Sequence, residues 1–331
     1  MKNKIKLLSA FLFLAFGISA QEKTDSTSVQ NLLSGNFETR QIFKHKGNFF
    51  FYWGYNRSAY TKSDIHFHGD GYHFSISDVE ATDSPTKEFI TYVKPNTFTI
   101  PQYNYRLGYF LTDKVFISLG EDHMKYDIKK QATHLSGSIS SGNNIGEYDN
   151  TEVVVGEGRL MDLHSFSKAI NNPSVLHQGH GSGDNGSILD SLPKGFVSGF
   201  EHCDGLNDVS LELGRIEQIW ISKNLKHALT VTGTIGSGMV IPDTDAQVLG
   251  KTSYHNQGRK TYHLAGYSFS ASMGIQFDFF RHFFLQGRIK GGYMNLPDIK
   301  TTLDGGKASQ HFSFIEGMFV VGYACAFGKT K

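Results

Sequence analysis

The most constraining feature of the sequence is a pair of long alternating runs within residues 260–295. In the first run, residues 265–277, apolar and aromatic side chains occupy every second position, with small or polar residues between them. A period of two indicates a β-strand, because successive side chains point to opposite faces. The second run, residues 283–293, repeats the pattern and carries Arg288 and Lys290 on its polar face. Strands this long with so polar a second face fit a transmembrane barrel, apolar to lipid and polar to the lumen, whereas a soluble sandwich would turn its apolar face inward.

The start of the chain indicates export. Basic residues precede the apolar run 7–16, and the small residues Ser19 and Ala20 follow it, which predicts a secretory signal peptide over residues 1–20, cleaved near Ala20. No other segment approaches about 20 consecutive apolar residues, so we expect no transmembrane helix in the processed chain. A membrane protein of this kind can only be a closed barrel. Residues 21–45 are polar and lack periodicity, so they are predicted to form a periplasmic lead-in.

Further alternating segments bring the predicted strand number to about eight, the smallest common barrel size. These segments are residues 48–56, 98–111, 115–122, 208–220, 226–240 and 310–327. The alternation loses phase near Arg215, which predicts a bulge or the membrane edge at that point. Three short turns, at 112–114, 222–225 and 279–283, alternate with four longer connections, so the short turns and both chain ends are predicted to be periplasmic.

The longer connections are predicted to lie outside the cell, and they are residues 57–97, 127–207, 241–259 and 296–308. Residues 63–78 and 151–156 within them are strand-like, so they either extend the barrel wall above the membrane or raise the strand number to ten or twelve. Residues 158–193 are rich in Gly, Ser, Asn and His and predict a flexible insertion. The predicted fold is therefore all-β, an antiparallel transmembrane barrel over residues 46–331 with long extracellular loops.

Composition restricts the partners. Aromatic residues make up 13% of the chain, which suits the aromatic girdles of a membrane barrel. The net charge of +1 gives no electrostatic reason to expect nucleic acid. Cys203 and Cys325 fall at opposite ends of the predicted barrel, so we expect no disulfide between them. We expect a monomer in the outer-membrane bilayer, inserted by the barrel assembly machinery, without a cofactor and with an extracellular partner of unknown identity.

Several short motifs carry a resemblance to a known family. They are Tyr52-Trp53-Gly54-Tyr55-Asn56-Arg57, Ser63-Asp64-Ile65-His66-Phe67 with Gly69-Asp70-Gly71-Tyr72, Asp122-His123-Met124-Lys125-Tyr126, Glu201-His202 with Asp204-Gly205-Leu206-Asn207, and Lys290-Gly291-Gly292-Tyr293 with Leu296-Pro297-Asp298-Ile299. Through these motifs most of the mature chain, apart from the 158–193 insertion, resembles a family of outer-membrane β-barrel proteins from Bacteroidetes. The resemblance implies a barrel and an outer-membrane location, and it implies no activity.

Charged side chains on the inward face form the first candidate site. They are Arg106, Asp122, Glu212, Asp278, Arg288 and Lys290. A barrel of about eight strands is filled by its own side chains, so inward charges must pair, and we interpret the set as an ion-pair network that replaces an apolar core. Glu212 and Asp122 are the expected partners of Arg288 and Lys290. A path for protons or solutes through these charges is the alternative.

Histidines in the long connections suggest a metal site. Asp64, His66, His68 and Asp70 alternate, so all four side chains could share one face of an extended strand and bind Zn²⁺ or Cu²⁺. A half-exposed extracellular strand would show the same polar alternation without a metal. His164, His177 and His180 in the predicted insertion form a weaker candidate of the same kind.

The stretch 201–207 is the most enzyme-like. Outer-membrane lipid A deacylases and phospholipases place a His two residues before a nucleophilic Ser on a barrel strand, and this stretch is faintly similar to theirs at His202 and Asn207. However, Asp204 occupies the serine position, and a carboxylate cannot replace the hydroxyl nucleophile. We therefore interpret the stretch as a loop-to-strand junction in which Asp204-Gly205 forms a turn. The sequence therefore predicts a structural, adhesive or partner-binding barrel, with a lipid-modifying esterase centred on His202 and a narrow transporter for small molecules as alternatives.

Overall fold

A computed structural model describes residues 43–142, 144–157, 192–255, 261–280 and 282–326. The predicted signal peptide, most of the lead-in, almost all of the 158–193 insertion, Arg281 and Phe327 lie outside the described residues. None of the helices in the described part is long and apolar enough to cross a membrane.

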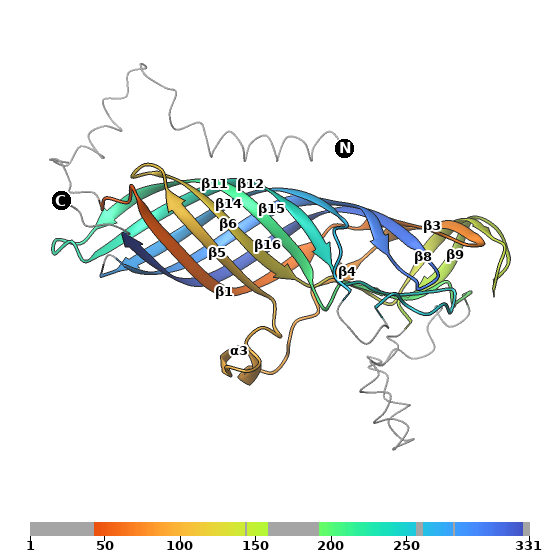
Figure 1. Ribbon diagram of the computed structural model, residues 1–331. Helices are drawn as coiled ribbons and strands as arrows, with labels where there is room; N and C mark the ends of the chain where they lie inside the picture. Colours follow the sequence, from red (N-terminus) through yellow and green to blue (C-terminus); the bar gives the residue numbers. More distant parts are fainter. Residues whose placement is uncertain (1–42, 143, 158–191, 256–260, 281, 327–331) are drawn as a thin grey trace, which may run out of the picture.

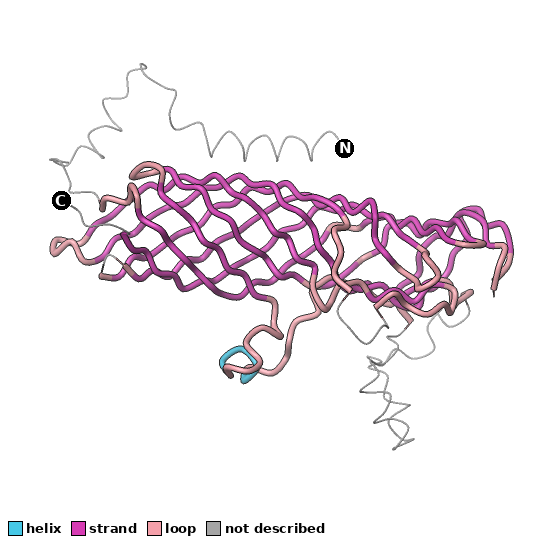
Figure 2. Tube along the Cα trace, in the orientation of Figure 1, coloured by secondary structure: helices cyan, strands magenta, loops and turns pink. Residues whose placement is uncertain are grey.

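Eight antiparallel strands close into a ring that forms the barrel (Figures 1 and 2). In ring order they are β1 (Asn48–Tyr60), β5 (Tyr103–Phe110), β6 (Val115–Met124), β11 (Leu206–Ile221), β12 (His227–Pro242), β14 (Gly266–Phe279), β15 (Phe283–Lys300) and β16 (Lys307–Ala326). Strand β1 pairs with β16 from Asn48 opposite Ala326 to Tyr60 opposite Phe314, which closes the ring. The predicted eight-stranded transmembrane barrel is confirmed, and so is the pairing of the two long alternating runs, which are β14 and β15.

The alternation of inward and outward side chains along β11 breaks at a different place from the one predicted near Arg215. Alternation continues past Arg215, because Ile216 is still buried inside the barrel. The register slips between Gln218 and Trp220, where β11 pairs with β12. The irregularity therefore lies nearer the periplasmic rim than the sequence indicated.

Much of the predicted extracellular loop region is regular sheet beyond one end of the barrel (Figure 1). Strands β2 (Ser63–Gly69), β3 (Tyr72–Val79), β8 (Gln131–Ile139) and β9 (Gly146–Val155) continue the barrel sheet outward from β16. A second sheet contains β4 (Ala81–Thr82), β7 (Asp127–Ile128), β10 (Val197–Glu201) and β13 (Asp245–Val248). The strand-like segments of the long connections thus extend the wall and do not enlarge the ring.

The two outer sheets share an apolar core. Phe67 on β2 meets Phe200 on β10 edge to face, with ring centroids 5.7 Å apart. Their neighbours Ile65, Phe74 and Ile76 are almost completely buried. We call this region the extracellular double sheet.

The interior of the barrel has three layers. At the extracellular end, residues of the double-sheet core such as Leu206, Val240 and Phe312 fill it. Charged residues occupy the middle. At the periplasmic end a second apolar cluster contains Phe50, Phe110, Phe116, Ile216, Phe284, Met318 and Val320.

Glycines make the periplasmic layer possible. The rings of Phe50, Phe116 and Phe284 lie where the missing side chains of Gly108, Gly214 and Gly322 on neighbouring strands would be. A Cβ atom at any of these glycines would overlap the ring above it. The inward glycines of the sequence therefore serve to seat aromatic rings across the lumen.

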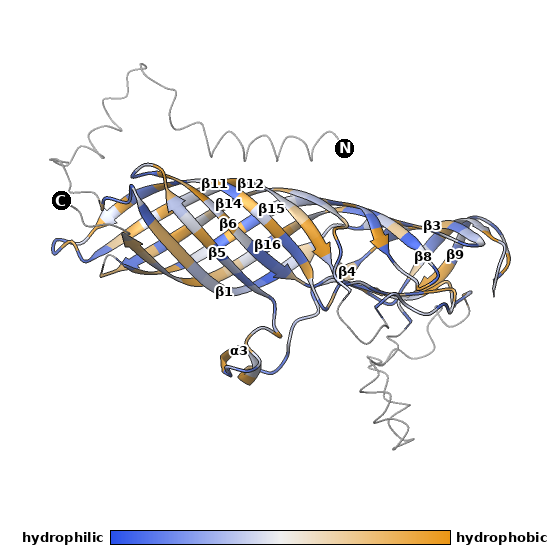
Figure 3. Ribbon diagram, in the orientation of Figure 1, coloured by the Kyte–Doolittle hydropathy of each residue, from blue (hydrophilic) through white to orange (hydrophobic). Residues whose placement is uncertain are grey.

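The outward face is apolar and lipid-facing, and Figure 3 shows the alternation of apolar and polar residues along the strands. On β14, Phe269 is 56% exposed whereas its neighbour Ser268 is completely buried. Aromatic residues lie near both ends of this face. Towards the extracellular side they are Trp53, Tyr55, Tyr103, Tyr105, Tyr267 and Tyr293, and towards the periplasmic side Phe49, Tyr109, Trp220, Phe279, Phe283 and Tyr323. Such belts are typical of barrels in a bilayer.

Candidate functional site: the charged lumen and the extracellular clusters

Two basic side chains of β15 organise the middle layer. The Lys290 Nζ donates to Asp122 Oδ2 at 2.5 Å and to Asp208 Oδ2 at 2.9 Å. The Arg288 Nη2 donates to Glu212 Oε2 at 2.5 Å. Because residues 288 and 290 are two apart on one strand, both side chains project into the lumen side by side.

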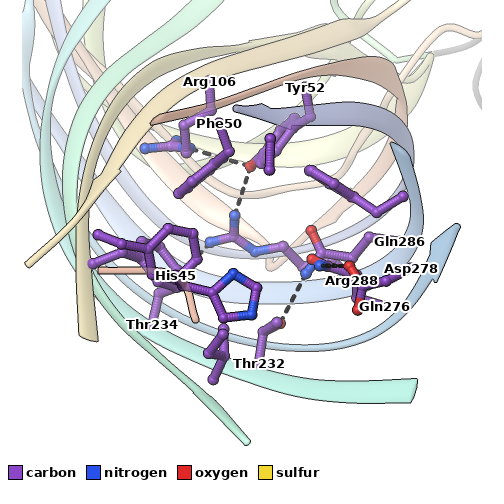
Figure 4. Close-up of a pocket in the computed structure, with 15 residues that line it drawn as sticks. His45, Phe50, Tyr52, Arg106, Thr232, Thr234, Gln276, Asp278, Gln286 and Arg288 are labelled. Atoms are coloured by element: carbon purple, nitrogen blue, oxygen red, sulfur yellow. Dashed lines mark hydrogen bonds between the residues drawn. The ribbon is translucent and has the colours of Figure 1, made fainter. Parts of the chain in front are cut away.

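Arg106 on β5 joins these pairs into one network. Its Nη2 lies 3.4 Å from Asp122 Oδ2 and 3.3 Å from Glu212 Oε1. The Tyr52 hydroxyl on β1 accepts from Arg288 Nη1 at 2.7 Å and from Arg106 Nε at 3.2 Å (Figure 4). All of these side chains are buried, so their charges are compensated mainly by each other.

Two acidic members of the layer were missed by the sequence analysis. Asp208 binds Lys290, and Glu316 on β16 lies opposite Lys290 in the strand register. Neither oxygen of the buried Glu316 carboxyl has a hydrogen-bond partner among the described residues. The inward parity of β16, with Gln310 and Phe312 also buried, is the signal that would have identified Glu316.

Asp278 stands apart from the other five predicted lumen residues. It lies at the periplasmic end of β14 and accepts from Thr230 Oγ1 at 2.9 Å and from Gln276 Nε2 at 2.7 Å. The inward direction follows the alternation, but the residue is too near the end of the strand to reach the cations of the middle layer.

A small cavity separates the charges from the periplasmic aromatic layer (Figure 4). Its volume is about 30 Å³, and Tyr52, Arg106, Thr232, Gln286 and Arg288 contribute to its lining. A space of this size accommodates about two water molecules. It lies between polar groups on one side and aromatic rings, among them Phe50, Phe110 and Phe116, on the other, and it is much smaller than a typical ligand pocket.

His45 covers the periplasmic side of this cavity. Its ring stacks on Phe110 with centroids 4.8 Å apart, its Nε2 lies 2.9 Å from Gln218 Nε2, and its backbone N–H donates to Asp113 Oδ1 at 2.9 Å. Burial lowers the pKa of His45 to about 4, although the Asp113 carboxylate acts in the opposite direction. The imidazole is therefore neutral when His45 is packed in this position.

This burial predicts a dependence on acid. The pKa of His45 is about 4 in the folded protein but has its ordinary value of 6.5 in the unfolded chain, so the unfolded chain binds more protons between these pH values. Stability should fall by up to about 3 kcal/mol as the pH is lowered through this window, and no further below it. Unfolding free energies of the wild type and His45→Phe, measured against pH, test this. The variant keeps an aromatic ring on Phe110 and should lack this component, whereas identical pH profiles would contradict the prediction.

The predicted metal ligands lie on the extracellular double sheet. Asp64, His66 and His68 share the exposed face of β2, and Asp70 lies in the turn that follows. The Asp64 Oδ1 accepts from the backbone N–H of Asp78 at 2.9 Å. Within the described part of the chain, no three of the four candidates bring ligand atoms within 4.8 Å of one another. A metal site here stays a prediction, and His164, His177 and His180 lie outside the described residues.

Close groups of ligand-type residues occur elsewhere on the double sheet. One contains Asp127, Glu201 and Cys203, and the other contains Asp204, Asp243 and His255. In the second group His255 Nδ1 lies 3.0 Å from Asp243 Oδ1, and His255 Nε2 lies 3.4 Å from Asp204 Oδ2.

The group Asp204, Asp243 and His255 connects separate loops through hydrogen bonds and ion pairs. The hydrogen bond to Asp243 is the largest cause that raises the pKa of His255, which favours an imidazolium between two carboxylates. Asp243 also accepts from Thr261 Oγ1 at 2.6 Å. The imidazole thereby links the connection after β10 to the connections before and after β13.

His202 occupies a core position. It is completely buried between Tyr126 and Phe200, and its Nδ1 lies 2.8 Å from Thr244 Oγ1. Burial lowers its pKa to about 3, and the charge of His263 acts in the same direction. Asn207 makes its contact elsewhere, with Oδ1 2.7 Å from His123 Nδ1. The pair suggested by the esterase motif is thus divided between separate hydrogen bonds.

Comparisons with known proteins give distant structural likenesses. No protein-family model matches the sequence, and no match was found among curated proteins. The structure is similar to the outer membrane protein OprG from Pseudomonas aeruginosa, with 9% identity, a TM-score of 0.38, and coverage of 87% of this chain and 100% of that one. It is also similar to Ail, the attachment invasion locus protein of Yersinia pestis, with 11% identity, a TM-score of 0.27, and coverage of 85% and 99%.

A third similar structure is the outer membrane protein AlkL in DMPC lipid bilayers, with 8% identity, a TM-score of 0.37, and coverage of 89% of this chain and 98% of that one. The assignment of the ring of eight strands comes from the pairing of the strands themselves.

Proposed function

We propose that this protein is an outer-membrane barrel whose lumen is a structural core and whose extracellular double sheet is a binding surface. The observation that carries the proposal is the occupation of the interior from end to end by side chains, in three layers. An eight-stranded ring is just wide enough for side chains to fill, so little space is left for a solute path. The resemblance of its motifs to outer-membrane barrels of Bacteroidetes supports the same location.

The charges in the middle layer support a structural role. Arg288, Lys290 and Arg106 each form an ion pair with at least one carboxylate. None of these three cations is therefore left without a partner to line an aqueous channel. Buried pairs of this kind are strongly unfavourable to break, because removal of one partner leaves an uncompensated charge. The network therefore acts as a plug that holds the strands in register.

The exposed face of the double sheet supports a binding role. Its strands present His66, His68, His73, His134 and Glu152 to solvent, while their apolar faces are packed inward. A regular sheet fixed to a barrel holds such side chains in a constant arrangement, as rigid binding sites require. The expected partner is polar and extracellular. An esterase role is not part of this proposal, since His202 is buried in the core.

Planar-bilayer recording tests the sealed lumen. The purified protein should give no steady conductance, while a porin inserted under the same conditions serves as the positive control. Arg288→Ala distinguishes a structural ion-pair network from a charge-lined channel, because the side chain contacts both Glu212 and Tyr52 in the centre of the lumen. A steady, ion-selective current in the wild type that changes in this variant would replace the structural role by a channel.

A further inference from the structure

We propose that residues 84–100 insert into the outer leaflet of the membrane and complete the lipid-facing belt beside β1, β5 and β6. We call this stretch the side segment. It contains the short helix α3 (Ile90–Val93). Figure 1 shows α3 displaced sideways from the barrel wall near β1, and not beyond the end of the barrel. The proposed partner is the acyl and headgroup region of lipid.

The side segment exposes an unusual amount of apolar surface. Phe89 is 77% exposed, Ile90 59% and Val93 57%, and Phe98 and Ile100 are also exposed. Helix α3 has no buried residue at all. In water, clustered apolar side chains of this size would be unfavourable, but at a bilayer surface they gain the free energy of burial.

The segment is held against the aromatic belt by specific contacts. The ring of Phe98 lies 5.4 Å from that of Trp53, and the ring of Tyr92 lies 4.9 Å from that of Tyr55. The Tyr55 hydroxyl also donates to the backbone oxygen of Phe98 at 3.3 Å. Because Trp53 and Tyr55 project from the outward face of β1, the side segment is continuous with the surface that faces lipid.

Both ends of the segment are fixed on the barrel. Arg57 Nε lies 2.6 Å from Asp83 Oδ2, and the Gln102 side-chain amide donates to the backbone oxygen of Asp83. Asp83 and Gln102 are both buried. The exposure of the residues between them is therefore a property of an anchored loop and not of a loose chain.

The barrel wall needs such an addition on this side. On β14 the outward face from Tyr267 to Phe279 spans about 30 Å of membrane at a rise of about 3.3 Å per residue and a tilt of about 40°. On β1 the corresponding aromatic limits, Phe49 and Tyr55, are only about 15 Å apart by the same estimate, and the charged Arg57 follows. The expected apolar band is about 25 Å tall, so this side is short of apolar surface where the side segment lies.

The two lysines of the segment fit the interface, and its acidic residue, Glu88, lies next to Lys87 and is also exposed. Lys87 and Lys94 flank α3 and are exposed. Lysines at the edges of an inserted apolar segment extend their ammonium groups to lipid phosphates, while their carbon chains remain in the apolar layer. The apolar residues between them then lie deeper, among acyl chains.

Depth-dependent quenching tests the insertion. In the full chain, with Cys203→Ser and Cys325→Ser, an environment-sensitive fluorophore is attached at Phe89→Cys, and the protein is reconstituted into phosphatidylcholine vesicles. Phe89 is largely exposed, so the label displaces no packed side chain. We expect a blue-shifted emission, a marked loss of fluorescence with lipids that carry a doxyl quencher on the acyl chain, and little loss with aqueous iodide.

The matched control is Ile145→Cys, which is 66% exposed but lies between β8 and β9 on the extracellular double sheet. It should show the reverse, with quenching by iodide and none by the doxyl lipids. Equal iodide quenching at both positions would overturn the proposal. So would protection of the Phe89→Cys label from both quenchers together with cross-linking between two chains, because that result would assign the surface to a second copy.

Discussion

Replacing Glu212 by alanine is expected to lower the free energy of unfolding by about 3–5 kcal/mol. Its two carboxylate oxygens lie 2.5 Å from Arg288 and 3.3 Å from Arg106. Without this carboxylate, the two buried guanidinium groups would keep neutral acceptors, such as the hydroxyls of Tyr52, Ser210 and Thr234. The nearest remaining carboxylate would be Asp122, 3.4 Å from Arg106. The adjoining cavity has room for about two water molecules, which is too few to hydrate two guanidinium groups fully, so the cost reflects stranded charge more than the loss of favourable pairing.

The matched control lies on the same strand. Glu217 pairs with Lys114 at 2.8 Å and Arg215 at 2.6 Å, but all three side chains are exposed at the periplasmic rim. Glu217→Ala should therefore change stability by less than about 1 kcal/mol. Urea titrations of both variants in the same vesicles, followed by tryptophan fluorescence, provide the comparison. Similar losses for the two would mean that the lumen charges are hydrated, as in an open channel.

Most of the barrel prediction follows from the alternation of apolar and polar residues along the strands. The period of two over residues 265–277 gives the strand, the direction of each side chain and the lipid-facing side together, because the pleat fixes all three. The inward direction of Arg106, Glu212 and Lys290 follows from the same parity. Closure also follows, since an open sheet edge is not tolerated in the hydrocarbon layer.

The extracellular double sheet was less accessible to such reasoning. Its strands β4 and β7 have two residues each, and they pair Ala81 with Ile128 across a long stretch of chain. Two residues show no period, and pairing between remote segments leaves no local signal. The deep burial of His202 depends on this remote packing, so the motif at residues 201–207 could not show by itself that His202 is a core residue.

The lumen partners show a similar limit. Parity places Glu316 inside the barrel, yet only the register of β15 with β16 sets it opposite Lys290. Register depends on turns and on which side chains fit across the lumen, as with the rings over Gly108 and Gly214. The sequence of one strand thus shows whether a side chain points into the lumen, whereas the partner of that side chain depends on the register of all the strands in the ring.

Placing arginine at Met273 is expected to cost about 2–4 kcal/mol, the range for a cation on the lipid face near the bilayer midplane. Met273 faces outward on β14, midway between Tyr267 and Phe279, which belong to the two aromatic belts. Tyr267→Arg is the control on the same strand and face, at the edge of the membrane instead of its centre. It should cost about 0–1 kcal/mol, because the side chain can reach the headgroups.

The measurement is the unfolding free energy of each variant in lipid vesicles, so that the hydrocarbon layer is present. A large cost at residue 273 with a small cost at 267 follows if hydrocarbon covers the centre of β14 and ends near the tyrosine. Small costs at both positions would mean that this face contacts water and not hydrocarbon. The assignment of its exposed apolar side chains to the lipid would then be wrong. Large costs at both would move the membrane boundary beyond Tyr267, and the belt on β1 would then be even shorter than the bilayer requires.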